Sequence, residues 1–314
     1  MVLLFFNRKG EDMHAEKEKT LGILAAIGAY IIWGVLPLYW KMAGAVPASE
    51  ILAYRIIWSF VFMVAIIAIL GKTKEVWTEI ISIFKRPKLI LAISVASVLI
   101  TANWFIFIFT VNDGHVISAS LGYYINPLVN VLLATVFLKE KLSRGEMLAV
   151  LSAAIGVLIL AIHQGVFPWA AISMAVTFGL YGLIKKLVPI SAWGGLTIET
   201  LIMTPFAMIF LLFFAQDAFM QFGLDTNLVL FGAGVVTAIP LLLFATSARR
   251  ISYVMLGFIQ YVGPTLMLIL GVFVFHEAFD STQLIAFLFI WAALLIFTVS
   301  NIVITQKMKK VTLS

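Results

Sequence analysis

From about residue 20 to residue 304, the chain alternates between long apolar stretches and short polar connections. Each apolar stretch has roughly the 20 residues that an α-helix needs to cross a bilayer. Charged residues, proline, glycine or a short polar run bound each one. The pattern predicts an all-α integral membrane protein with ten spanning helices, at about 21–40, 51–70, 89–110, 116–138, 146–162, 168–184, 194–214, 228–246, 253–275 and 283–304.

The composition agrees with this prediction. Of the 314 residues, 63% are hydrophobic and 11% are charged, and the mean hydropathy is +1.10. Soluble domains are about half apolar and a quarter charged, so a soluble globular protein is excluded. The chain has no cysteine, which excludes disulfides, thiolate nucleophiles and cysteine-bound metals.

The basic residues predict the orientation of the chain. Of the 21 Lys and Arg residues, 19 fall in the two tails and in alternate connections, whereas Lys41 lies on the other side and Arg55 lies inside a span. Because cytoplasmic loops carry the excess of Lys and Arg, both termini are expected in the cytoplasm. Basic residues dispersed among membrane-surface loops do not form a nucleic-acid-binding face.

The second half of the sequence repeats the first. At a constant offset of 137 residues, Tyr124 aligns with Tyr261, and Pro127 aligns with Pro264. Because each unit crosses the membrane an odd number of times, its second copy must be inserted in the opposite orientation. Inverted repeats of this kind are the architecture of secondary transporters. The predicted divisions are a cytoplasmic tail at 1–20, five-helix repeats at 21–163 and 168–304, and a second cytoplasmic tail at 305–314.

Several motifs resemble those of a known family. They are Trp33-Gly34, Pro37-Leu38-Tyr39, Glu50 to Arg55, Asn103-Trp104, Ser120 to Pro127, Tyr181-Gly182, Glu199-Thr200, Thr237 to Pro240 and Gln260-Tyr261. Through them, residues 20–304 resemble the RarD branch of the EamA group, in the drug/metabolite transporter superfamily. The resemblance implies two inverted five-helix halves, a bacterial cytoplasmic membrane, and export of small metabolites or drugs. Tyr54, where His is more usual, and the extension before Lys17 depart from the pattern.

Two ionisable residues fall inside the predicted spans. Arg55 and Glu199 each lie about a turn and a half from one end of a span. A charge in hydrocarbon is costly and normally faces a partner or a water-filled cavity, so both are candidates for gating or coupling. The structural alternative is that Arg55 reaches the interface or binds backbone carbonyls, and that Glu199 caps a helix. Their opposite depths argue against a direct ion pair between them.

A second group of residues resembles the wall of a binding site, which is mostly apolar and aromatic with a few polar groups. Tyr123, Asn126 and Asn130 follow i, i+3, i+7 spacing and so share one helix face. The alternative is that such side chains join packed helices by hydrogen bonds. The predicted substrate-binding residues are Trp33, Asn103, Trp104, Tyr123, Tyr124, Asn126, Asn130, Tyr181, Gln260 and Tyr261.

The repeat also pairs residues that affect helix ends and kinks. Pro127 and Pro264 each remove a backbone donor, and they are predicted hinges, with a simple packing kink as the alternative. Glu140 and Glu277 follow the fourth and ninth spans, where a carboxylate is expected to cap a helix.

Aromatic residues near span ends are expected to be interfacial anchors, namely Tyr30, Trp40, Trp77, Trp169 and Trp193. No phosphate-binding loop, HExxH or GxSxG motif occurs, so neither ATP-driven pumping nor the usual hydrolase chemistry has support. No metal and no cofactor are predicted.

Together these features predict a secondary transporter, not an enzyme, that moves a small amphipathic metabolite, amino acid or drug outward. Two mechanisms fit: exchange against protons through Glu199, or uncoupled facilitation, which the scarcity of carboxylates within the spans favours. A non-transporting sensor or assembly protein is the alternative. The expected partners are a small-molecule substrate and the lipid bilayer, with a monomer and a homodimer both compatible.

Overall fold

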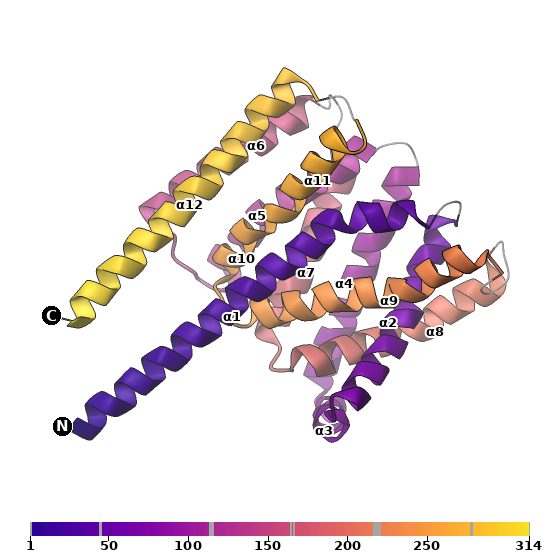
Figure 1. Ribbon diagram of the computed structural model, residues 1–314, viewed down its shortest axis with the longest axis horizontal. Coiled ribbons are helices and arrows are strands. Elements are labelled where there is room, and N and C mark those ends of the chain that lie inside the picture. Colours follow the sequence, from indigo (N-terminus) through magenta and orange to yellow (C-terminus); the bar gives the residue numbers. More distant parts are fainter. Residues whose placement is uncertain are drawn as a thin grey trace.

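The chain forms a bundle of long α-helices (Figure 1), and the computed structural model describes residues 2–43, 46–112, 116–163, 165, 167–215, 221–276 and 279–313. No strand occurs in these ranges. The helices are α1 (Val2–Lys41), α2 (Ala48–Ile69), α3 (Thr73–Phe84), α4 (Pro87–Asn112), α5 (Val116–Phe137), α6 (Arg144–His163), α7 (Trp169–Leu187), α8 (Ala192–Phe213), α9 (Leu224–Ala248), α10 (Tyr253–Gln260), α11 (Val262–Phe273) and α12 (Ser281–Leu313).

The helices confirm the predicted membrane fold. Within the described ranges, nine helical segments are long and apolar enough to cross a bilayer, with α10 and α11 counted as one, and Leu121–Phe137 of α5 is a shorter apolar helix. Each predicted span matches one of these ten segments. Many large apolar side chains remain exposed, such as Leu158 on α6 and Leu295 on α12. Such surfaces suit contact with lipid.

Both chain ends lie on one side of the bundle in Figure 1, which we call the terminal side; the other is the far side. The helix α1 continues through the predicted tail at 1–20, and α12 continues to Leu313. Both tails are therefore extensions of spanning helices. One ion pair holds the first extension, because Arg250 Nε lies 2.8 Å from Glu18 Oε2.

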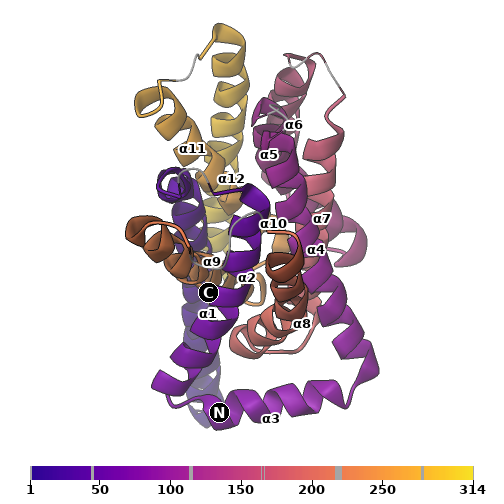
Figure 2. The same cartoon turned by 90° about the vertical axis from the view of Figure 1, so that its right-hand side faces the viewer.

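The helix α3 occupies a connection for which only a basic loop was expected. It crosses the terminal side at the bottom of Figure 2. Its 12 residues are too few to span a bilayer, and it is amphipathic, with Val76, Ile80 and Ile83 buried on one face. Glu79 joins it to the start of α8 by accepting hydrogen bonds from the backbone N–H and the hydroxyl of Ser191.

The two halves of the chain interlock rather than sit apart. The third span of each half packs against the first span of the other, since α4 contacts α7 and α9 contacts α1. The last spans of both halves, α6 and α12, lie side by side (Figure 1). Lys139 and His276, which are 137 residues apart, both have a φ of 54°. This shared backbone turn agrees with the offset of the sequence repeat.

Small residues allow some of these helices to approach closely, as is common in membranes. At Gly234 of α9, a methyl group would overlap the backbone of Trp58 in α2. At Gly156 of α6, it would come within 2.6 Å of the carbonyl oxygen of Ala286 in α12. These two contacts bring spans of opposite halves together.

Candidate functional site

A cavity of about 100 Å³ lies between the two halves. Helices α1, α2, α4 and α5 of the first half and α7, α10 and α11 of the second supply its wall, from the middle of the spans toward the far side. We call it the main cavity. Its lining residues are Tyr30, Trp33, Leu36, Pro37, Trp40, Arg55, Asn103, Trp104, Phe107, Tyr123, Asn126, Phe178, Gln260, Gly263, Pro264 and Met267.

Arg55 is the cation of this wall. It lies in the second turn of α2, and its Nε donates a hydrogen bond to Thr237 Oγ1 at 3.0 Å. Its Cζ lies 4.8 Å from the ring centroid of Trp40 and 4.4 Å from that of Trp104. Aromatic faces attract a guanidinium, the more so where water is scarce. The two rings and Thr237 therefore hold the guanidinium inside the span instead of letting it reach the interface.

Amide side chains supply most of the neutral polar groups of the cavity. Asn103 Nδ2 donates to the carbonyl of Met174 at 2.7 Å and to Thr177 Oγ1 at 3.1 Å, which fastens α4 to α7. Gln260 Oε1 accepts from Asn130 Nδ2 at 2.7 Å, which fastens α10 to α5. Asn103 and Gln260 therefore line the cavity and also join helices by hydrogen bonds.

An aromatic cluster forms another part of the wall. The ring of Trp33 lies 5.5 Å from Tyr30 and 5.8 Å from Phe178 between centroids. Behind them, Tyr181 and Phe244 stack at 5.9 Å with their planes 15° apart. Ring pairs at these separations are favourable beyond the area they bury. The cluster connects α1, α7 and α9 and gives the cavity a firm apolar surface.

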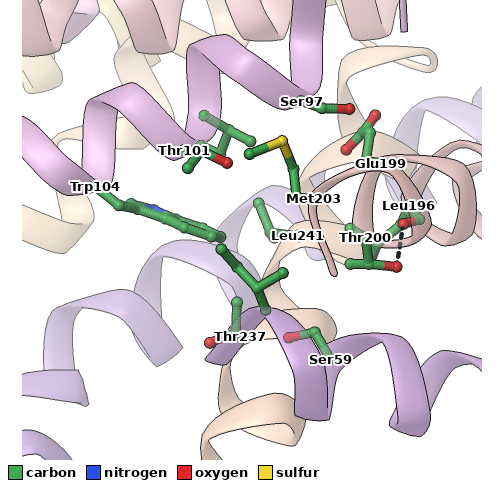
Figure 3. A pocket seen from close by; sticks show the side chains of 12 residues that line it. Ser59, Ser97, Thr101, Trp104, Leu196, Glu199, Thr200, Met203, Thr237 and Leu241 are labelled. Atoms are coloured by element: carbon green, nitrogen blue, oxygen red, sulfur yellow. Dashed lines mark hydrogen bonds between the residues drawn. The ribbon is translucent and has the colours of Figure 1, made fainter. Parts of the chain in front are cut away.

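A second, much smaller pocket lies on the other side of Trp104, which lines both spaces. Its volume of about 20 Å³ is enough for about one water molecule. Figure 3 shows Ser97 and Thr101 of α4 on one side of it and Ser59 and Thr237 on the other. We call it the Glu199 pocket. Its lining residues are Ile56, Ser59, Ser97, Ile100, Thr101, Trp104, Leu196, Glu199, Thr200, Met203, Thr237 and Leu241.

Glu199 carries the charge of that pocket, and it belongs to a buried ion pair. Its Oε1 accepts a hydrogen bond from Lys185 Nζ at 2.6 Å, and its Oε2 accepts one from the hydroxyl of Tyr181 at 3.2 Å. The exposed fractions of Lys185 and Glu199 are 5% and 4%. Lys185 is one of the 19 basic residues that were predicted to lie in tails and connections, and for this residue the prediction was wrong. Glu199 does not cap α8, because Ser191 accepts from the N–H of Gly194 there.

One span of the second half is interrupted beside the main cavity. The helix α10 ends at Gln260 and α11 begins at Val262, whereas α5 runs unbroken through Pro127. Pro264 has no N–H to donate to the carbonyl of Gln260, four residues earlier. Gln260 is the last residue of α10. Tyr261 keeps a right-handed helical backbone (φ −61°, ψ −15°), so the break is a local kink within one span.

Glu140 caps a helix, as predicted, but that helix is α10 and not α6, which follows Glu140 in the chain. Its two carboxylate oxygens accept from the backbone N–H groups of Tyr253 at 2.8 Å and Val254 at 3.0 Å. These are the first residues of α10, in the opposite half of the chain. Glu277, for which the same role was expected, lies outside the described residues.

The structure gathers part of the predicted site around the main cavity. Trp33, Asn103, Trp104, Tyr123, Asn126 and Gln260 line it, together with Arg55 and Pro264. Four of the other predicted residues are buried nearby: Tyr124 donates to the carbonyl of Pro264 at 3.1 Å, Asn130 holds Gln260, and Tyr181 holds Glu199, while Tyr261 is fully buried. Pro127 follows the lining residue Asn126 in α5 but does not itself line the cavity.

Two aromatic residues of α1 were assigned to the wrong environment. Tyr30 and Trp40 were expected at the membrane interface, but both line the main cavity. With Trp33 and Pro37 they are spaced i, i+3, i+7, i+10, which places all four on one helix face. That spacing is present in the sequence and could have identified the face. Phe107, Phe178 and Met267 carried no comparable signal.

The described part of the chain contains no group of three or more His, Asp or Glu side chains that could hold a metal ion. The wall of the main cavity offers aromatic faces, side-chain amides, the hydroxyl groups of Tyr30 and Tyr123, and one guanidinium. Such a wall can bind an amphipathic small molecule.

Comparison with known proteins gives this chain clear relatives. Residues 20–162 match the EamA-like transporter family. An uncharacterized transporter of Bacillus subtilis, YojE, is 48% identical over 92% of this chain and 96% of its own length. Protein RarD of Escherichia coli K12 is 40% identical over 94% of this chain and 99% of its own length, and Protein RarD of Salmonella typhi is 43% identical over 93% and 99%.

A solved crystal structure has the same fold. It matches with a TM-score of 0.68 at 19% identity, over 88% of this chain and 97% of that chain. The sequence relatives extend over nearly the whole chain, including both five-span halves and the cavity between them. The chain therefore belongs to the RarD branch of the EamA-like transporter family, and it is a multi-pass membrane protein.

Proposed function

We propose that the protein is a secondary transporter that exports a small amphipathic metabolite, amino acid or drug. The observation that supports this most directly is the main cavity, because residues of both halves form its wall. A site at the interface of two inverted halves can be opened to one side and then to the other when the halves rock against each other. The kink between α10 and α11, at the predicted hinge Pro264, lies beside this cavity.

The orientation is part of the proposal. Apart from buried Lys185, the basic residues of the tails and terminal-side connections face a cytoplasm in which both termini lie. The main cavity then occupies the outer part of the membrane, and the Glu199 pocket lies closer to the cytoplasm. For an exporter, a cavity in the outer part corresponds to the stage at which solute leaves.

The coupling of transport is open to two mechanisms with different requirements. Exchange against protons needs a carboxylate that is released and protonated during the cycle, and Glu199 is the candidate. Uncoupled facilitation needs no such group. The ion pair of Glu199 with Lys185 favours the second mechanism, because proton exchange at Glu199 would leave the Lys185 ammonium buried without its partner.

The test is release of solute from liposomes that contain the purified protein. A panel of amino acids, amphenicols and small aromatic solutes is loaded, and release is followed with and without an imposed proton gradient, against liposomes without protein. Release that depends on the protein supports transport. Acceleration by the gradient that Glu199→Gln abolishes supports proton exchange, and release that ignores the gradient supports facilitation.

A sensor, an assembly protein and a membrane enzyme are the competing functions. The described wall of the main cavity contains no His, Asp or Glu, so the side chains most often used for general acid–base catalysis are missing from it. Absence of release for every solute in the panel would contradict the transporter proposal and favour a sensor.

A further inference from the structure

The main cavity has an uncompensated positive charge. Its described wall includes Arg55 but no carboxylate. Three ion pairs join described residues, namely Lys185 with Glu199, Arg250 with Glu18, and His163 with Asp280, and Arg55 belongs to none of them. A guanidinium that is 8% exposed is costly to bury without a counter-charge. This cost is reduced if an anion occupies the cavity.

The contacts of Arg55 leave the two terminal Nη groups of its guanidinium available to a ligand. Its contacts are the Nε hydrogen bond to Thr237 and the rings of Trp40 and Trp104. Within the described chain, neither Nη donates a hydrogen bond to a protein acceptor. The guanidinium is thus fixed by its neighbours while its terminal N–H groups are free. Two parallel N–H groups on a planar fork match the two oxygens of a carboxylate.

Further polar atoms of the wall also lack protein partners. The hydroxyl of Tyr30 and Oδ1 of Asn126 are buried, and neither has a hydrogen-bond partner in the described residues. Tyr30 is 2% exposed and Asn126 is 3% exposed. Buried polar groups are nearly always satisfied, and a solute that brings its own polar groups into the cavity would satisfy these two.

The rest of the wall suits an apolar body. Trp33, Phe107, Phe178 and Met267 present ring faces and a thioether to the same space. A volume of about 100 Å³ restricts the solute to a small molecule. Size, charge and wall chemistry thus agree on one class of compound.

We propose that the transported solute is a small organic monocarboxylate, whose carboxylate binds the Arg55 guanidinium while its apolar part packs against the aromatic wall of the main cavity. This rests on the proposed function and specifies the substrate class of the same site. Zwitterionic amino acids fit less well, because the described wall offers no anionic group for their ammonium. Neutral drugs fit less well, because they leave Arg55 without a counter-charge.

The test compares an acid with its neutral isostere. Binding of 3-phenylpropionate and 3-phenylpropionamide to the full-length protein is measured by calorimetry in nanodiscs of uncharged phosphatidylcholine. We expect the acid to bind about ten- to a hundredfold more tightly, the usual effect of a charge-assisted hydrogen bond. Arg55→Gln should abolish the preference, and Arg55→Lys should keep part of it.

Lys41 provides the matched control. It is an exposed cation on the same side of the bundle, with its Nζ over the ring of Phe275 at 5.0 Å, and it does not line the cavity. Lys41→Gln should keep the full preference for the acid. Unchanged binding of the amide by Arg55→Gln would show that this variant is folded, and Arg55→Lys provides the comparison if it is not.

Three results would overturn the inference: equal binding of acid and amide by the unmodified protein, binding of neither, or a preference that survives in Arg55→Gln. The release experiment separates this outcome from failure of the proposed function. Protein-dependent release of a neutral solute without any preference for acids leaves the transporter standing and rejects the anion. Arg55-dependent binding of the acid without release of any solute rejects transport and keeps the anion site.

Discussion

Lys185 Nζ lies 2.6 Å from Glu199 Oε1, and the two side chains form a buried ion pair between α7 and α8. The hydroxyl of Tyr181 donates to the other carboxylate oxygen. The pair lies beside the hydroxyl-lined Glu199 pocket, close to the terminal side. It therefore joins two spans of the second half near the terminal side, which in the proposed orientation is the cytoplasmic side.

Breaking this pair on one side should be costly. We expect Glu199→Gln and Lys185→Gln each to lower the free energy of unfolding by about 3–5 kcal/mol, because each leaves one charge buried without a partner. The double variant should regain most of the loss. Thermal unfolding of the purified protein measures all three.

The exposed pair of Glu18 and Arg250 is the control. Glu18→Gln should cost less than about 1 kcal/mol, because surface ion pairs contribute little. Single variants at Glu199 and Lys185 as stable as Glu18→Gln would show that the buried pair does not hold α7 to α8.

Gly234 should tolerate no larger side chain. The Cβ of Gly234→Ala would overlap the backbone of Trp58, so α2 and α9 would have to separate. We expect a loss of roughly 1–3 kcal/mol or more, the usual cost of overpacking, measured as a lower unfolding temperature. Gly28→Ala is the matched control, because its added methyl meets only Leu243 Cδ1 at 3.4 Å. Equal stability of the two variants would contradict the close approach of these helices.

The amides of the main cavity should separate into structural and binding effects. Asn130→Ala and Gln260→Ala each remove the 2.7 Å bond between α5 and α10. A double-mutant cycle should give a coupling of about 0.6–2 kcal/mol in stability.

Gln260 also lines the cavity, so Gln260→Ala should weaken solute binding as well. Asn130→Ala removes the same bond from a residue that does not line the cavity, and it should affect binding less. Equal effects of the two variants on binding would assign Gln260 to packing alone. Asn103→Ala should weaken both binding and stability, because its amide also holds α4 to α7.

If the solute is an anion, the rate of its release should depend on the membrane potential. If an organic anion crosses without a proton, an interior-negative potential should accelerate its release from liposomes, by a driving force of about 2.3 kcal/mol per 100 mV. A potassium gradient with valinomycin sets the potential, and release of 3-phenylpropionate is followed. The corresponding amide should be released at a rate independent of voltage. Release of the anion that ignores the potential would indicate that a compensating charge moves with it.

The fold was largely predictable from the sequence because bilayer thickness fixes the length of each apolar segment. The ten segments follow from that constraint, and the 137-residue repeat follows from matching residues such as Tyr124 and Tyr261. The helix α3 was missed because its 12 residues are too short for the same criterion, and its apolar face becomes visible only as Val76, Ile80 and Ile83 on one side of a helix. Pro127 and Pro264 were given the same predicted kink, but only the span of Pro264 is broken, between α10 and α11, whereas α5 is continuous through Pro127.

The site was only partly predictable because residue type does not give the rotation of a helix. Tyr30 and Trp40 are aromatic and near span ends, and they were assigned to the interface although α1 turns them inward. Lys185 was counted with the surface charges, since a lysine at a span end usually is one. Its partner, Glu199, was identified in the sequence because a charged side chain inside a membrane span is energetically costly. The pairing itself depends on how α7 and α8 pack, which one sequence does not reveal.

Glu140 has a consequence for the synthesis of the protein. It accepts hydrogen bonds from amide groups at Tyr253 and Val254, 113 and 114 residues later in the chain. At 5–20 residues per second, the ribosome needs roughly ten seconds to reach them. During that interval the first half carries a carboxylate whose partners have not yet been translated. When α10 is inserted, the carboxylate that caps its start is already present in the first half, so this cap forms only as the second half docks onto the first.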